Sequence, residues 1–134
     1  MMTATEDLAR RLDAIACDYL VARYTGPGNP MGTETLRAGS AVATKVPAVP
    51  MNPLMNSARG IERVDELEAV RAFYAATQQA CWVEVSPYTR PAVTGALIRA
   101  GFHVERYAAT LYAAPMPATH HHGVRLEEVS ASGL

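Results

Sequence analysis

Side chains that could act as nucleophiles are few in this sequence, and they are scattered along it. Lys45 is the only lysine, and every other basic residue is an arginine, which keeps its proton near pH 7, so we do not expect a catalytic lysine. Cys17 falls in a predicted helix and Cys81 at the start of a predicted strand. We expect two small buried thiols, because a disulfide would need an oxidising compartment and no signal peptide precedes the fold.

Two further patterns resemble ligand sites only superficially. The imidazoles of His120, His121 and His122 are good metal ligands, but adjacent side chains do not converge on one ion and no Cys, Asp or Glu follows at zinc-like spacing. We therefore predict a solvated linker and no metal site. The glycines of 26–32 follow a helix and are interrupted by prolines, so the strand–loop–helix context of a phosphate loop is missing.

The composition is that of an ordinary globular domain. The chain has 134 residues, 49% of them hydrophobic, and a formal net charge of −1. It is long enough for one domain with a real core, and no excess of positive charge indicates nucleic acid. No stretch is apolar enough to span a bilayer, so we expect a soluble cytoplasmic protein.

Helical and strand periodicities alternate along the chain, which predicts an α/β (α+β) fold with a central, mainly antiparallel sheet flanked by helices. Prolines 47, 50 and 53 predict a loop or an edge. The predicted elements are a helix over 3–23, a hairpin over 32–46, a strand over 54–59, a helix over 65–77, a strand over 81–85, a helix over 89–100 and a strand over 102–113.

Local signals sharpen these boundaries. Gly39 supplies the positive φ of the hairpin turn. Asp65 and Glu68 have capping-box spacing, Thr89 can cap the following helix, and Gly101 ends it. In the first helix Leu8, Leu12, Ile15 and Tyr19 share one face, which we expect to be buried. The predicted core is Leu8, Leu12, Ile15, Leu67, Val70, Val83, Val85, Leu97, Phe102 and Val104.

The order of these elements resembles the GNAT N-acetyltransferase family over roughly residues 5–113. The resemblance depends on the strand segment Cys81–Pro87 and on Leu97-Ile98-Arg99-Ala100-Gly101-Phe102, a short helix that a glycine ends before an aromatic residue. The helix ending in Phe73-Tyr74 and the proline-rich approach to Asn56 are similar to the N-terminal half of bacterial tandem GNAT proteins. Val124-Arg125-Leu126-Glu127 is similar to the opening of their second domain.

The resemblance implies an acetyl-CoA loop between a strand and a helix, here Ser57–Asp65. In active members, glycines and the amides of a helix N-terminus hold the pyrophosphate. This stretch has only Gly60, and Glu62 and Asp65 place negative charge where the phosphate should lie. Arg59, Gly60 and Arg63 are the candidate cofactor-binding residues of a degenerate loop.

The same resemblance implies two candidate catalytic residues, Glu84 and Tyr88. Glu84 could deprotonate an amine through water, and Tyr88 or Tyr112 could serve as a general acid by analogy with the tyrosine of many family members. For Glu84 the alternative is a solvent-facing strand residue, and for both tyrosines it is amphipathic packing.

Residues 1–113 are accordingly interpreted as a GNAT-like domain, 114–123 as a linker, and 124–134 as the start of a missing second domain or an exchanged strand. The function that we favour is the non-catalytic N-terminal half of an acetyl-CoA-dependent acyltransferase, which shapes the acceptor cleft and binds no CoA itself. Its partner would be a second GNAT domain or a homodimer mate, and its acceptor an unknown small amine or other acyl acceptor. The alternatives are an active minimal acetyltransferase with an atypical CoA loop, and a small-molecule-binding or dimerisation module.

Overall fold

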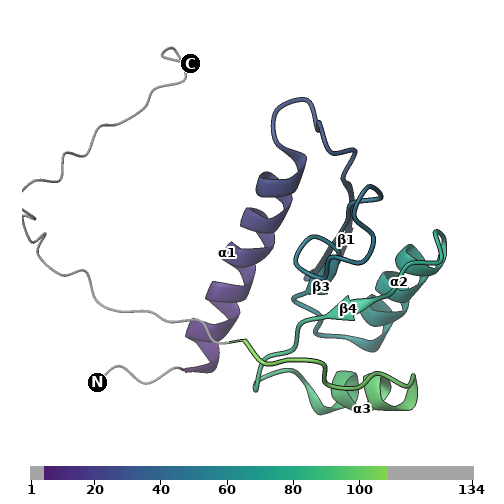
Figure 1. Cartoon of the computed structure of the whole chain (residues 1–134). Coiled ribbons are helices and arrows are strands. Elements are labelled where there is room, and N and C mark those ends of the chain that lie inside the picture. Colours follow the sequence, from purple (N-terminus) through teal and green to yellow (C-terminus); the bar gives the residue numbers. More distant parts are fainter. Residues whose placement is uncertain (1–4, 109–134) are drawn as a thin grey trace, which may run out of the picture.

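The structure is a computed structural model that describes residues 5–108. In this part of the chain, seven elements follow one another (Figure 1). They are α1 (Glu6–Thr25), β1 (Glu34–Ala38), β2 (Ala41–Lys45), β3 (Ser57–Arg59), α2 (Val64–Ala75), β4 (Trp82–Val83) and α3 (Pro91–Arg99).

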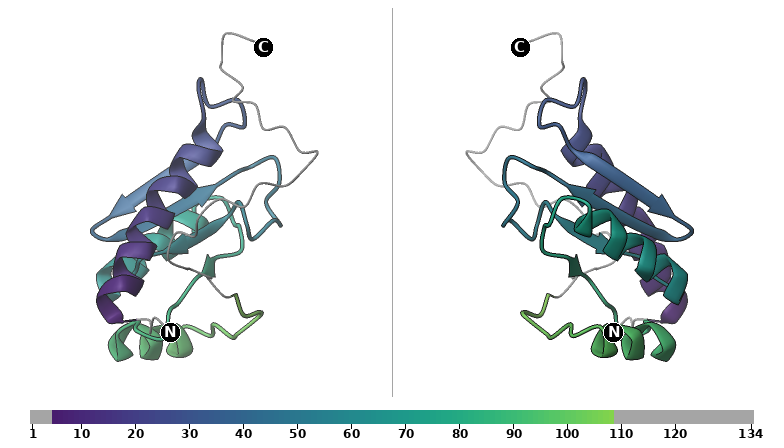
Figure 2. Two further views of the ribbon diagram at one scale, coloured as in Figure 1. Left: turned by 90° about the vertical axis from the view of Figure 1, so that its left-hand side faces the viewer. Right: turned by 90° about the vertical axis from the view of Figure 1, so that its right-hand side faces the viewer.

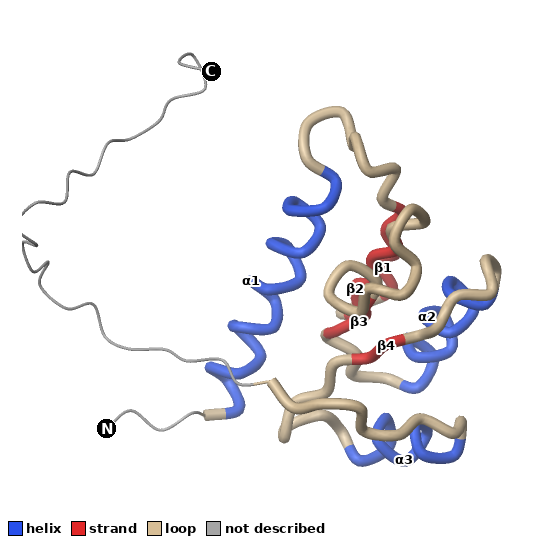
Figure 3. Tube along the Cα trace, viewed as in Figure 1, coloured by secondary structure: helices blue, strands red, loops and turns tan. Residues whose placement is uncertain are grey.

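The four strands form one mixed sheet in the order β1-β2-β3-β4 (Figure 3). β1 and β2 are antiparallel, as are β2 and β3, whereas β3 and β4 are parallel and are joined through α2. The hairpin is the predicted one, with Ala38 opposite Ala41 and Gly39 at φ +60° in the turn. The α+β class is therefore confirmed.

Helices cover both faces of this sheet. Figure 2 shows α1 across one face and α2 across the other, with α3 beside α2 at one end. Every residue of β2 is buried as a result. Side chains alternate along a strand, so Ala41 and Ala43 face α2, while Val42 faces α1. The main core lies on the α2 side and contains Ala41, Ala43, Ala58, Ile61, Leu67, Val70, Tyr74, Val93, Ala96 and Leu97.

The predicted inward face of α1 is wrong. Ile15 is 65% exposed and Tyr19 is 60% exposed, whereas Cys17, Leu20 and Tyr24 are buried against the sheet. The inward side continues toward the N-terminus of the helix through Asp13 and Arg10, at the spacing of three and four that keeps residues on one face. Apolar periodicity failed here because half of the inward face is polar.

The prediction of the core is confirmed for residues of α2 and α3 and is wrong for several residues outside these helices. Leu67, Val70 and Leu97 are buried, and Leu8, Leu12, Val83 and Phe102 are half-buried. Val85 is 54% exposed because it lies beyond the short strand β4, and Val104 is 67% exposed. Residues 102–108 form no strand, so the prediction of a strand from Phe102 is wrong in the described part. Residues 109–134, which include Tyr112, the histidine run and the predicted second-domain start, lie outside the described residues.

The helix ends are capped by nearby side chains, prolines and glycines, but the capping residue is not always the predicted one. Thr5 caps α1 by accepting a hydrogen bond from Leu8 N, and Pro91 opens α3. Thr89 was predicted to cap α3, but its hydroxyl accepts a hydrogen bond from Ser86 N instead. Gly101, at φ +85°, ends α3 as expected. Within residues 5–108, no helix has the length and apolarity needed to cross a bilayer.

Candidate functional site

The loop that leads into α2 is bound by a carboxylate of the helix itself. Glu66 Oε2 accepts hydrogen bonds from Glu62 N (2.8 Å) and Arg63 N (3.1 Å), and Glu66 Oε1 accepts one from Ser40 N (3.0 Å). The side chain of Glu66 is only 1% exposed. The helix begins at Val64 with Arg63 at its N-cap, so the predicted capping box of Asp65 and Glu68 is wrong and Glu66 has the reciprocal role.

Both glycines around this turn are required by close packing. Gly60 has φ +73°, and a Cβ there would lie 2.6 Å from Ser40 O. Gly39 has φ +60°, and a Cβ there would lie 2.1 Å from Glu66 Oε1. The hairpin turn therefore presses against the loop that leads into α2, and the one glycine of that loop serves this contact.

These residues do not fit the pyrophosphate of a CoA cofactor. A phosphate at this loop needs amide N–H groups that are free to donate, and those of Glu62 and Arg63, which lead into α2, already donate to Glu66. Asp65 adds a second negative charge beside them. Hydrogen bonds from Arg63 above all, and then neighbouring amides, hold the pKa of Asp65 below its usual value.

A cavity of about 180 Å³ opens on the α1 side of this loop. Its lining residues come from the N-terminal half of α1 and from the segments that follow β3 and β4. Its lining residues are Arg10, Asp13, Ala14, Cys17, Ser40, Gly60, Ile61, Glu62, Glu84, Ser86, Tyr88, Thr89 and Arg90. The polar inward face of α1 is thus one wall of the cavity.

Ion pairs bind most of the charged groups at this cavity. Arg10 contacts Glu62 and also lies 2.7 Å from Glu6, while Arg90 lies 3.8 Å from Glu62. On the other side Arg59 contacts Glu84. These pairs join α1, the β3–α2 loop and the β4–α3 segment.

Asp13 is the exception among the carboxylates that line the cavity. Within residues 5–108 it forms no hydrogen bond or ion pair. Burial raises its pKa, and the negative charge of Glu84 raises it further, while Arg59 and Arg10 act in the opposite direction. Burial also raises the pKa of the neighbouring Cys17 thiol, which keeps that thiol protonated and unreactive near neutral pH.

The structure gathers some of the predicted site residues and separates others. Gly60, Glu84 and Tyr88 line the cavity, and Arg59 reaches it through its contact with Glu84. Glu84 is therefore a paired carboxylate. Arg63 does not line the cavity and instead donates to Asp65 on the surface.

Sequence reasoning missed Glu66, Arg10 and Asp13. Glu66 gave no capping signal because its partner position holds Arg63 rather than a serine, threonine or aspartate. Arg10 and Asp13 could have been found from their spacing to Cys17, Leu20 and Tyr24, but the apolar residues on the opposite side of α1 gave a competing pattern.

Other side chains that could take part in chemistry have structural roles in the described part of the chain. Lys45 is buried, and its Nζ donates to Phe73 O (3.2 Å), pairs with Glu34 (3.1 Å) and lies 4.3 Å from the Phe73 ring centroid. These contacts tie β2 to α2 and to β1. Burial raises the pKa of the Cys81 thiol to about 11. In the described part of the chain, no three His, Cys, Asp or Glu residues are arranged to hold a metal ion.

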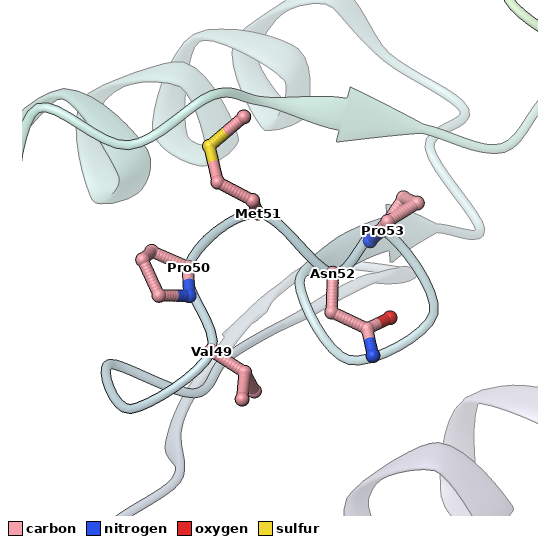
Figure 4. A pocket seen from close by; sticks show the side chains of 5 residues that line it. All are labelled: Val49, Pro50, Met51, Asn52 and Pro53. Carbon is pink, nitrogen blue, oxygen red and sulfur yellow. The ribbon is translucent and has the colours of Figure 1, made fainter.

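A second hollow, formed by Val49–Pro53 between β2 and β3, is open to solvent (Figure 4). Its five side chains splay in different directions around the loop and include no ionisable group. This hollow therefore offers no acid–base chemistry.

Comparison of the chain with protein-family models, with curated proteins and with solved structures finds no match.

Proposed function

We propose that this chain is a GNAT-like domain that shapes a cleft for a small acceptor and does not hold acetyl-CoA. The proposal is supported by the element order, in which a hairpin, a short strand, a helix, a second strand and a helix follow one another. It is supported also by the cavity, which lies at the ends of β3 and β4 and gathers Gly60, Glu84 and Tyr88.

One observation carries the non-catalytic part of the proposal, namely the position of the Glu66 carboxylate. To bind a pyrophosphate at α2, the domain would have to move a buried carboxylate away from three backbone N–H groups. The displaced charge would then face the incoming phosphates and repel them. Gly60 does not offer the phosphates another approach to the backbone, because Ser40 O packs against its Cα, only 2.6 Å from where a Cβ would lie.

In this proposal the catalytic group belongs to a partner, either a second GNAT-like domain or another copy of the chain. The contribution of this domain is the wall of the acceptor cleft that α1 and the segments after β3 and β4 build. Glu84 has a positioning role, because its contact with Arg59 fixes the segment after β4 beside the loop after β3.

Calorimetric titration of the full chain with acetyl-CoA tests the proposal. We expect no saturable heat up to millimolar acetyl-CoA, and only background thiol release when acetyl-CoA and a panel of primary amines are added. Micromolar binding, or turnover that Arg59→Ala or Arg63→Ala abolishes, would instead support the active minimal acetyltransferase. Amide NMR spectra of the same samples establish that the chain is folded.

A further inference from the structure

The polar cavity beside α1 has an uncompensated negative charge. Four carboxylates and three guanidinium groups belong to its ion-pair network or line it, and they are Glu6, Asp13, Glu62 and Glu84 against Arg10, Arg59 and Arg90. The three arginines are committed to Glu6, Glu62 and Glu84 by direct contact. The remaining negative charge resides on Asp13.

We propose that the cavity binds a small primary ammonium group through Asp13. A half-buried carboxylate without a bonded partner is unfavourable, and a cation with several N–H donors satisfies both its charge and its lone pairs. An anionic ligand is disfavoured because each arginine of the network already contacts a carboxylate, which offsets the positive charge that an anion would need. A metal ion is disfavoured because a single uncommitted carboxylate is too few ligands.

The cavity also limits the body of the ligand. Its volume of about 180 Å³ corresponds to about six water molecules at the volume of liquid water. Ala14, Cys17 and Ile61 form an apolar wall, against which a short aliphatic chain can lie. A short unbranched amine satisfies both requirements. The cavity is the cleft of the proposed function, on which this assignment rests for its biological role, but binding at Asp13 requires no CoA.

Amide NMR spectra of the full chain, titrated with n-butylammonium and separately with n-butanol, test the assignment. We expect saturable shifts of the cavity amides, those of Asp13, Cys17, Gly60 and Ile61, with butylammonium and much weaker ones with butanol. Asp13→Asn should weaken butylammonium binding at least tenfold. Asp18→Asn is the matched control, because it removes the same charge from the same helix at a surface position outside the cavity and should leave binding unchanged.

Binding should also weaken as the pH falls through the raised pKa of Asp13, since only the carboxylate attracts the ammonium group. Arg10 on α1, Arg59 on β3 and Glu84 after β4 are the charged groups that act on Asp13. Ala14→Leu, which retains Asp13 but fills the apolar wall, should reduce the affinity as well.

Equal shifts with butanol, unchanged affinity in Asp13→Asn, or shifts confined to residues outside the cavity would each overturn the assignment. The outcome is separable from that of the proposed function. A chain that binds acetyl-CoA and still takes butylammonium at Asp13 refutes the non-catalytic role alone. A chain that ignores both ligands refutes the ammonium site alone.

Discussion

At the scale of single residues, Glu66 connects more of the structure than any predicted site residue. Its two oxygens accept hydrogen bonds from the hairpin turn at Ser40 and from the amides that precede α2. The same carboxylate therefore closes the helix N-terminus and attaches the β1–β2 turn to it. A group that stabilises the fold in this way removes the donors that a phosphate would need.

We expect Glu66→Ala to lower the free energy of unfolding by about 2–4 kcal/mol, because three backbone amide donors lose the buried charged acceptor that they share. Glu68→Ala is the control on the same helix. Glu68 pairs only with Arg71 at the surface, and its loss should cost less than about 1 kcal/mol. Denaturant melts measure both, and equal small losses would show that Glu66 is not an essential cap.

Asp13 has the opposite effect on stability. Its pKa in the folded chain is raised, so the folded chain binds more protons than the unfolded chain between the ordinary pKa of 3.8 and the folded value. Stability therefore falls as the pH rises through this window, and the penalty is complete above it. Asp13→Asn removes the penalty, and we expect this variant to be more stable than the wild type at pH 7.

The gain from Asp13→Asn should shrink as the pH is lowered and vanish well below pH 3.8, where Asp13 is protonated in both states. Denaturant melts of both proteins across this pH range provide the measurement. A variant that is less stable than the wild type at pH 7 would mean that Asp13 has a stabilising partner in the folded chain.

At the scale of elements, local signals predicted what local chemistry decides. The hairpin turn at Gly39, the irregular proline segment and the end of α3 at Gly101 were all predicted, because each depends on a backbone preference of one or two residues. The buried side of α1 was not predicted, because it depends on which residues face the sheet. Helical periodicity alone cannot show that a helix turns Arg10 and Asp13 inward toward a cavity.

The candidate site also combines residues that the sequence pointed to with contacts that only tertiary packing decides. Gly60, Glu84 and Tyr88 were candidates implied by the family resemblance, and the structure places all three at one cavity, which does not test the roles assigned to them. The ion pairs of Arg10 with Glu62 and of Arg59 with Glu84 join residues 52 and 25 positions apart. Such pairs are set by tertiary packing, so the sequence carries no short-range signal for them.

Two glycines with the same backbone angle separate conformational strain from close packing. Gly60 and Gly28 both have φ +73°, but a Cβ at Gly60 would lie 2.6 Å from Ser40 O and one at Gly28 would meet nothing within 4 Å. Gly28→Ala should cost about 1 kcal/mol through φ alone. Gly60→Ala should cost at least about 2 kcal/mol, because the hairpin turn must also shift. Denaturant melts that show equal losses would contradict the close contact between this loop and the turn.

At the scale of the whole molecule, the fold consists of a four-stranded mixed sheet between α1 on one face and α2 and α3 on the other side. The apolar core lies on the α2 side, whereas the α1 side is half apolar and half polar. This asymmetry places the cavity where the polar half of α1 meets the ends of β3 and β4. The apolar core thus lies on one side of the sheet, and the polar cavity lies on the other.

The central claim is that Glu66 occupies the amides where a CoA pyrophosphate would bind. Amide NMR spectra of the wild-type chain during titration with acetyl-CoA test it most directly, because they report on the N–H groups of Ser40, Glu62 and Arg63 individually. We predict that these three signals do not move at any acetyl-CoA concentration up to the millimolar range. Saturable shifts of these signals would show that the phosphate displaces Glu66, and would contradict the claim.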